Sequence, residues 1–222
     1  MILGIVTAVV FALVAAAGLT KRLPQGSWLR RSLRATHRPL GYLLLALSAA
    51  HLILALKLIH QRPPIMLAAG FAMFGCALFS CFSRALFAKN AKRGMLLHRL
   101  SGLIMALLLV VHIAFGIGSL INYQREMAAV SISSVSMENL PDGNYEGVCD
   151  VGYIKARVCV TIENSRMTKI ELMEHRNERG AAGEGVVERM LEAQSTQVDT
   201  VSGATNSSRV IQKAVENALT QP

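Results

Sequence analysis

The hydrophobic and polar positions of the chain follow different patterns in its two halves. The first half contains four apolar runs close to the roughly 20 residues that cross a bilayer as a helix. These runs cover residues 2–19, about 39–59, about 65–87 and about 100–121. The second half has only short segments with the period of a strand or a helix. The pattern predicts a membrane all-α four-helix bundle followed by a small α+β domain.

Short alternating and amphipathic segments fill the chain after residue 140. "YIKARVCVTIE" and "MTKIELMEH" have the period of two that is typical of strands, and the turn-like "NSR" joins them. "GEGVVERMLEAQS" and "SSRVIQKAVENAL" have the apolar spacing of amphipathic helices. The predicted division is a transmembrane domain at 1–122, a polar linker at 123–140 and an outer domain at 141–222.

A secretory signal peptide is an alternative interpretation of the first apolar run, residues 2–19. Signal peptides usually begin with positively charged residues, and no Lys or Arg precedes this run. We therefore expect the run to remain as the first of four spanning helices.

Charge is divided unevenly between the two halves. Residues 1–121 contain thirteen Lys or Arg and no acid, whereas residues 122–222 contain ten Lys or Arg and all fourteen acids. The net charge of +9 is therefore +13 on one half and −4 on the other. Because the basic residues cluster between apolar runs, the basic composition does not indicate a nucleic-acid partner.

The basic clusters also predict the orientation in the membrane. Loops 20–38 and 84–99 carry most of the Lys and Arg of the first half, and basic loops stay in the cytoplasm. The segment between the second and third runs offers only Lys57 and Arg62. We therefore expect a multi-pass protein of the cell (inner) membrane, with its N-terminus and its C-terminal domain both extracytoplasmic.

The second and fourth apolar runs contain an internal repeat of histidines. "HRPLGYLLLALSAAH" extends from His37 to His51, and "HRLSGLIMALLLVVH" extends from His98 to His112. Each copy is H-R-x-x-G, nine further residues and a second His, and the copies lie 61 residues apart. Fourteen helical residues return to within roughly 40° of the starting face and rise about 21 Å. The two histidines of each helix therefore share a face at two levels of the membrane.

Matched histidines at two levels predict two haem sites. The facing pairs are His37 with His98 at the inner level and His51 with His112 at the outer level. Two facing imidazoles can fill both axial positions of a haem iron. A glycine in each copy, Gly41 and Gly102, would let a porphyrin approach the backbone. The two levels are too far apart to share one zinc ion, and isolated helix-packing histidines are the alternative.

The membrane half, about residues 1–121, resembles the ferric-reductase-like and related b-type cytochrome membrane domains, although it is shorter than their usual six helices. The resemblance implies two stacked b-type haems ligated by the four paired histidines. His60, at the outer end of the second run, has no counterpart after His112. We interpret it as an interfacial residue, with a role near the outer haem as the alternative.

The outer domain resembles the FMN-binding domain of the C subunit of the sodium-pumping NADH:quinone reductase and of the G subunit of the Rnf complex. The similar segments are "DGNYEG" (142–147), "EH" (174–175), "GAAGEG" and "DTVSGAT" (199–205). The last one fits the flavinylation pattern Asp-x-x-Ser-Gly-Ala-Thr, in which the final Thr carries FMN through a phosphoester bond. The resemblance therefore implies covalent FMN on Thr205 and a flavin transferase as the maturation partner.

The residues around Thr205 are chemically suited to this role. Ser202, Gly203 and Ala204 are small and leave room for a phosphate and for a transferase. Thr205 lies close to the predicted last helix, where free N–H groups and the helix dipole favour an anionic phosphate. The alternative is that Ser202 or Thr205 is only an N-cap.

Two further residues are candidates for the flavin site. Asp199 is expected to position the loop or assist the modifying enzyme. His175, with Glu174 beside it, is a candidate lining residue of the isoalloxazine pocket, and a solvated pair at a strand end is the alternative.

The sequence contains no nucleophile–base pair, P-loop or Rossmann glycine fingerprint, so we assign no catalytic residue. We expect an electron-transfer oxidoreductase component that moves electrons across the bilayer through two haems to the external FMN and on to an external acceptor. Its donor is expected to be a quinol or a membrane redox partner. The alternative is a membrane anchor or docking flavoprotein subunit of a larger redox complex without haem. A disulfide between Cys149 and Cys159 is left open.

Overall fold

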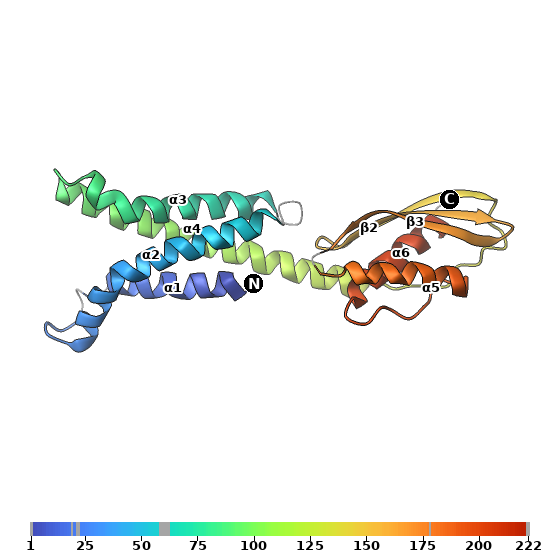
Figure 1. Cartoon of the computed structure of the whole chain (residues 1–222), viewed down its shortest axis with the longest axis horizontal. Helices are drawn as coiled ribbons and strands as arrows, with labels where there is room; N and C mark the ends of the chain where they lie inside the picture. The colour runs from blue at the N-terminus through green and yellow to red at the C-terminus, as the bar shows by residue number, and fades with distance from the viewer. Residues whose placement is uncertain (1, 19, 21–22, 58–62, 178, 221–222) are drawn as a thin grey trace. The chain divides into compact units, whose positions relative to one another are not determined.

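The computed structural model describes residues 2–18, 20, 23–57, 63–177 and 179–220. The chain divides into two compact units, Met1–Gly116 and Ile117–Pro222, which are described separately (Figure 1). The interpretation of His60 lies outside the described residues, as do three of the basic residues used for the orientation, Lys21, Arg22 and Arg62.

Helices make up the first unit (Figure 1). They are α1 (Ile2–Gly18), α2 (Trp28–Leu56), α3 (Pro64–Leu86) and α4 (Ala91–Ala129), whose last turns belong to the second unit. The helices α2, α3 and α4 are long and apolar enough to cross a membrane, whereas α1 is a shorter apolar helix of 17 residues. These helices suggest a multi-pass membrane protein.

Two helices extend beyond the apolar runs that predict them. The helix α2 begins at Trp28, where Ser27 Oγ accepts a hydrogen bond from Arg30 N at 3.3 Å, so much of the predicted basic loop is helical. The helix α4 continues to Ala129, so the first residues of the predicted linker are helical too. An apolar run marks only the part of a helix that is suited to lipid, and Arg, Gln, Glu and Met continue a helix readily.

A small apolar cluster joins the four helices of the first unit. Its buried members are one residue from each helix: Val10, Leu44, Ala77 and Met105. Most other large apolar side chains of this unit are exposed, and an apolar helix surface of this kind is suited to lipid.

The second unit is a three-stranded antiparallel sheet covered by helices (Figure 1). The strands β1 (Gly143–Asp150), β2 (Lys155–Glu163) and β3 (Arg166–Arg176) lie in chain order in the sheet, followed by η3 (Ala181–Gly185), α5 (Val186–Ala193) and α6 (Thr205–Thr220). Asn164 and Ser165 both have positive φ, 52° and 58°, as the two-residue turn between β2 and β3 requires. The sheet-and-helix composition agrees with the predicted α+β domain.

The sequence did not predict β1 as a strand. Its segment, "GNYEGVCD", contains two Gly, an Asn and an Asp, all of which are poor strand formers. The strand forms because Gly143–Asp150 pairs along its whole length with β2 and packs against α6.

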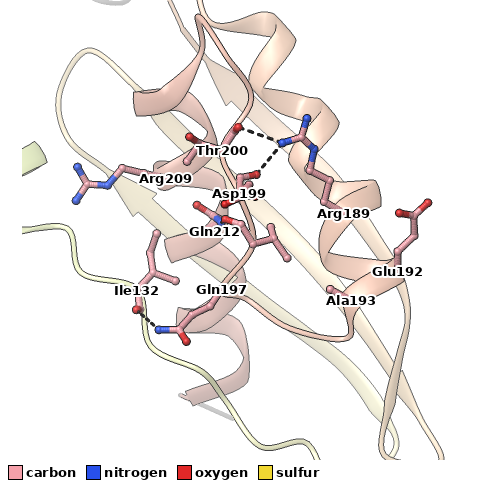
Figure 2. Close-up of a pocket in the computed structure, with 10 residues that line it drawn as sticks. Ile132, Arg189, Glu192, Ala193, Gln197, Asp199, Thr200, Arg209 and Gln212 are labelled. Atoms are coloured by element: carbon pink, nitrogen blue, oxygen red, sulfur yellow. Dashed lines mark hydrogen bonds between the residues drawn. The ribbon is translucent and has the colours of Figure 1, made fainter.

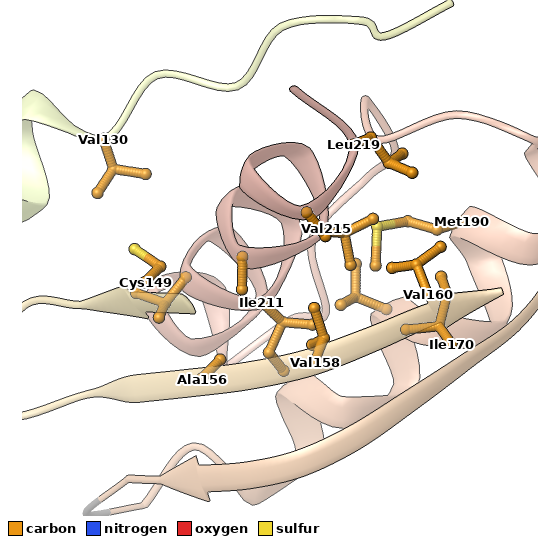
Figure 3. Packing of buried hydrophobic residues seen from close by; sticks show 14 of the residues in the cluster. Val130, Cys149, Ala156, Val158, Val160, Ile170, Met190, Ile211, Val215 and Leu219 are labelled. Atoms are coloured by element: carbon orange, nitrogen blue, oxygen red, sulfur yellow. The ribbon is translucent and has the colours of Figure 1, made fainter. Parts of the chain in front are cut away.

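The core of the second unit lies between the sheet and α6 (Figure 3). Alternate residues of β2, namely Ala156, Val158, Val160 and Ile162, are completely buried. Val210, Ile211, Ala214, Val215 and Ala218 of α6 are completely buried as well. This packing fixes both the register of the strands and the place where α6 begins.

Gly147 of β1 is the point of closest approach between the sheet and α6. A Cβ atom at this position would lie 2.1 Å from the carbonyl oxygen of Ala214 and 2.5 Å from the backbone nitrogen of Ala218. Backbone atoms cannot swing aside as a flexible side chain can. A larger residue would therefore push the helix away from the sheet.

We expect Gly147→Ala to lower the free energy of unfolding of the second unit by about 3 kcal/mol, the upper part of the usual range for overpacking. Pulse proteolysis of the full-length protein across a urea gradient would measure it. Gly143→Ala is the matched control on the same strand, because its Cβ would meet only Tyr145, at 4.0 Å. Equal stability of the two variants would contradict the close approach.

Candidate functional site

The motif at residues 199–205 forms a tight turn that leads into α6. Ala204 N donates a hydrogen bond to Val201 O at 3.0 Å, which closes a four-residue turn. Gly203 occupies its third position with φ +77°, the conformation that makes glycine favourable there in a type II turn. The turn places Thr205 as the first residue of the helix.

Ser208 holds this turn against the helix. Its Oγ accepts a hydrogen bond from Val201 N and donates one to Ala204 O, both at 3.1 Å. Ser202 and Thr205 are both exposed, and neither makes a side-chain hydrogen bond within the described part of the chain. The capping interpretation of these two hydroxyls therefore has no hydrogen bond to support it here, and Thr205 is left accessible at the helix N-terminus.

Asp199 lies at the start of the turn and is tied down through its backbone. Arg189 Nη1 donates hydrogen bonds to the carbonyl oxygens of Asp199 and Thr200, at 2.9 and 3.0 Å (Figure 2). The Asp199 residue itself is exposed. A groove of about 970 Å³ lies beside it. Its lining residues are Ile132, Arg189, Glu192, Ala193, Gln197, Val198, Asp199, Thr200, Arg209 and Gln212.

His175 is turned toward the protein by an irregularity in β3. The register of β3 against β2 shifts between the pairs Arg157–Glu174 and Val158–Leu172, so Met173 is an extra residue. After this bulge His175 pairs with Ala156, which is completely buried, and the His175 side chain is only 3% exposed. A bulge re-aims side chains in this way.

The neighbours of His175 distinguish it from Glu174. His175 Nδ1 lies 2.8 Å from Glu184 Oε1, and His175 Nε2 is buried without a hydrogen-bond partner among the described residues. Glu174 instead pairs with Lys155 at 2.7 Å, and this hydrogen bond lowers the pKa of the Glu174 carboxyl. Of the two, His175 is thus the residue with a buried polar atom still able to bind a ligand.

A second unpartnered polar atom lies in the first turn of α6. Ser207 is 1% exposed, and its Oγ has no hydrogen-bond partner among the described residues. Gly180 and the adjoining η3 pack closely on it, since a Cβ on Gly180 would lie 2.0 Å from Ser207 Oγ and one on Gly183 would lie 2.7 Å from Ser207 Cβ. These two glycines bring the "GAAGEG" loop against the start of the helix.

The four repeated histidines of the first unit come together in two pairs. The ring centroids of His37 and His98 are 5.9 Å apart with an interplanar angle of 80°. Those of His51 and His112 are 6.4 Å apart with an angle of 75°. Imidazoles bound to opposite sides of one metal, at about 2.0 Å per bond, have ring centroids roughly 6 Å apart.

Neighbouring helices orient the rings through backbone groups. His37 Nδ1 lies 3.2 Å from Val14 O of α1, and His98 Nδ1 lies 3.1 Å from Ser80 O of α3. A carbonyl oxygen can only accept, so each Nδ1 carries the hydrogen in these contacts and Nε2 keeps its lone pair. This tautomer is the one that binds a metal through Nε2.

The outer pair is flanked by the same two helices. His112 Nδ1 is buried near the backbone of Met66 of α3 and has no hydrogen-bond partner among the described residues. A Cβ on Gly4 of α1 would lie 3.1 Å from His51 Cε1. Both pairs are therefore enclosed by α1 and α3 as well as by the helices that carry them.

An apolar layer separates the two histidine levels. Leu44 and Met105, which are 5% and 8% exposed, lie halfway along the sequence between the two histidines of their helices. Beside the inner pair, a Cβ on Gly41 or Gly102 would have no described atom within 4 Å. Among the described residues there is no group of three or more His, Cys, Asp or Glu that could hold a metal ion. Each histidine pair thus consists of two facing imidazole rings, with no further His, Cys, Asp or Glu grouped with it among the described residues.

Cys149 and Cys159 are free thiols in this structure. Cys149 pairs with Ala156 and Cys159 pairs with Glu146, so the two cysteines are offset along the β1–β2 ladder. Burial raises the pKa of the Cys149 thiol to about 11. Cys149 therefore packs as a small apolar residue on the face toward α6.

Sequence reasoning missed the structural roles of several residues that build these sites. Glu184, Ser207, Ser208 and Arg189 act through contacts between segments that are distant in the chain. The contact between the "GAAGEG" segment and the first turn of α6 could not be predicted from the sequence either. The only local signals were the three Gly of the "GAAGEG" segment and the two Ser at the start of α6.

Comparisons with known proteins agree with the geometry of the second unit. Residues 152–220 match the family described as the FMN-binding domain. The chain is also 37% identical over 90 residues to an uncharacterized protein of Treponema pallidum (strain Nichols). That match covers 39% of this chain and 25% of the relative, so the chain spans about a quarter of the length of that protein. Residues 152–220 are therefore an FMN-binding domain, which suggests a flavoprotein that takes part in electron transfer.

Proposed function

We propose that the protein is a membrane flavocytochrome that moves electrons across the bilayer, between two b-type haems and a covalently bound extracytoplasmic FMN. The observation that carries the proposal is the pairing of four intramembrane histidines at two levels, at centroid distances of 5.9 and 6.4 Å, in a chain that also contains an FMN-binding domain. The four apolar helices form the membrane bundle, residues 1–122, and α1 is its shortest span.

The second unit has groups that fit FMN. Thr205 offers an exposed hydroxyl at a helix N-terminus, where a phosphate is favoured. Ser207 Oγ and His175 Nε2 are buried polar atoms without partners among the described residues, and both lie near the "GAAGEG" loop or the start of α6. A buried polar group without a partner is costly, so a bound ligand would relieve both. Ser202, Gly203 and Ala204 form the turn that leaves Thr205 accessible to a flavin transferase, with Asp199 at its start.

The first unit has groups that fit haem. His37 and His98 would hold the inner group, and His51 and His112 the outer one, each through Nε2. The carbonyl oxygens of Val14 and Ser80 fix the inner rings by accepting from Nδ1, which raises the basicity of the ligating nitrogens. Gly41 and Gly102 leave the backbone accessible beside the inner pair.

When bound, haem supplies one-electron transfer and FMN accepts either one or two electrons. The flavin domain therefore suits the junction between a one-electron chain and a two-electron acceptor outside the membrane. The donor in this proposal is a quinol or a membrane redox partner. A covalent bond keeps FMN on an outer face where a dissociated cofactor would be lost.

The orientation is a testable part of the proposal. The many Lys and Arg around the start of α2 and in residues 84–99, where α3 ends and α4 begins, favour a cytoplasmic position for those segments. We expect a phosphatase fused after Pro222 to be active and a cytoplasmic reporter at the same position to be inactive. A cytoplasmic readout would overturn both the extracytoplasmic flavin and the assignment of inner and outer histidine pairs.

Visible spectroscopy of the purified protein tests the function itself. We expect reduced-minus-oxidised bands of b-type haem together with flavin absorption that survives denaturation. A protein that carries flavin but no haem band would instead be the anchor or docking subunit of a larger redox complex. A protein that shows haem bands but no covalent flavin would support the membrane cytochrome and would contradict FMN as the electron carrier on the outer side.

A further inference from the structure

Two tyrosines of the second unit form an aromatic pair. Tyr123, Tyr145 and Tyr153 are the only Phe, Trp or Tyr residues after residue 116. Tyr123 and Tyr153 lie with their ring centroids 5.2 Å apart and their planes tilted by 41°. Tyr123 belongs to the end of α4, and Tyr153 lies in the turn between β1 and β2. The fold thus gathers two of its three large aromatic rings from distant segments.

The tyrosine pair, Tyr123 and Tyr153, lies next to the predicted attachment residue. Asn206 directly follows Thr205 and donates a hydrogen bond from Nδ2 to Tyr123 Oη at 2.8 Å. Both tyrosines are half-buried, so each keeps an accessible part of its surface, whereas Thr205 and Asn206 are exposed. Open aromatic surface therefore lies one residue away from Thr205.

The turn that carries Tyr153 is held by a charged network. Arg176 Nη2 donates hydrogen bonds to both carboxylate oxygens of Asp150, at 3.0 and 3.2 Å, and to Gly152 O at 2.9 Å. Asp150 Oδ1 also accepts from Gly152 N at 2.9 Å. Gly152 has φ +79°, a backbone conformation that residues with a side chain rarely adopt. Tyr153 is therefore presented on a fixed turn rather than on a loose loop.

Resting on the proposed attachment of FMN to Thr205, we propose that the tyrosine pair is the surface against which the isoalloxazine ring of that FMN packs. The flavin ring is a flat aromatic system, and aromatic rings pack in offset or tilted arrangements with centroids roughly 4.5–7 Å apart. The ribityl chain between phosphate and ring is long enough to reach a neighbouring residue. No other described Phe, Trp or Tyr pair exists in this unit.

The groove beside Asp199 is a less suitable place for the flavin ring. Its lining includes the charged side chains of Arg189, Glu192 and Arg209 and contains no Phe, Trp or Tyr. Thr205 is not among its lining residues either. The tyrosine pair supplies the apolar aromatic surface that the groove lacks, and the polar atoms of His175 and Ser207 remain for the phosphate and the polar parts of FMN.

Packing against tyrosine has an optical consequence that can be measured. An excited flavin takes one electron from a contacting phenol ring and then returns it, so emission is quenched with no net oxidation or reduction. Phenylalanine packs in the same way but is a poor electron donor. Replacement of tyrosine by phenylalanine keeps the ring and its packing but removes the phenol hydroxyl, which at Tyr123 accepts the hydrogen bond from Asn206. Two variants that both contain Tyr123→Phe, one with Phe and one with Trp at position 153, share this loss, so the difference between them reports electron donation.

The experiment compares full-length protein loaded with covalent FMN, as the native protein and after denaturation. We expect native emission of the wild type to be several-fold below that of the same sample denatured, which corrects for FMN content. The double variant Tyr123→Phe with Tyr153→Phe should recover most of the emission, whereas Tyr145→Phe should match the wild type. Adding Tyr153→Trp to Tyr123→Phe should restore quenching, because tryptophan is also a good donor.

Equal native emission from the wild type and the double variant would overturn the packing surface while leaving the attachment intact. Absence of covalent flavin from the denatured wild type would overturn the attachment, and the packing surface with it. The wild type and the three variants differ only in the second unit, so differences in emission among them report the tyrosines and not any haem of the first unit.

Discussion

Thr205→Ala is expected to abolish covalent flavin while leaving the fold and the haem bands unchanged. The phosphoester needs an accessible hydroxyl, and Thr205 is exposed at the first position of α6 with no side-chain hydrogen bond among the described residues. Since the side chain makes no such bond, its loss should change the free energy of unfolding by less than about 0.5 kcal/mol. Co-expression with a flavin transferase should add the mass of FMN minus one water to the wild type only.

Neighbouring hydroxyls provide the controls for this result. Ser202 is exposed in the turn, so Ser202→Ala tests whether it helps attachment, and we expect weakened or normal flavin content. Ser207 and Ser208 are 1% and 0% exposed and therefore cannot replace Thr205 without a rearrangement of the helix start. Yellow fluorescence that persists in a denaturing gel of Thr205→Ala would show that the motif was misassigned.

Local patterns in the sequence were sufficient where one element carries the information. The spacing of fourteen residues between the two histidines of each helix predicts a shared helix face. The structure brings His37 next to His98 and His51 next to His112. The alternation of β2 likewise gives its buried face, Ala156 to Ile162, directly. Both results depend only on helix or strand geometry.

Contacts between elements could not be predicted in the same way. The bulge at Met173 reverses the alternation of β3 and turns His175 inward, while Glu174 pairs with Lys155. Regular alternation from the buried Ile170 would have placed Glu174 on the inner face instead. Tyr123 illustrates the same limit, because the predicted linker gave no sign that α4 continues to meet Tyr153.

The hydrogen-bond partners of the histidine rings could not be predicted from the sequence, for a related reason. Val14 and Ser80 contribute backbone carbonyl oxygens, so their side chains carry no signal for this role. Only the packing of α1 and α3 beside the histidine helices reveals them. The sequence therefore predicted the candidate ligands but not the contacts that select the ring tautomer.

His37→Ala and His98→Ala are each expected to remove the same haem and to retain the other. Their rings face each other at 5.9 Å, so loss of either leaves one axial position of the same group empty. The second level is separated by the buried Leu44 and Met105 and keeps both of its own histidines. Each variant should therefore retain about half of the haem absorbance, with an identical residual spectrum.

Two further variants make this result specific to ligation. His98→Met retains a possible axial ligand, so it should keep both haems with one at a raised potential, as expected when Met replaces His. Leu44→Ala removes buried packing between the levels without touching a ligand, and it should keep the full haem content. Redox titration followed by visible absorption distinguishes these outcomes. If His37→Ala and His112→Ala left the same residual spectrum instead, the pairing of α2 with α4 at two matched levels would be wrong.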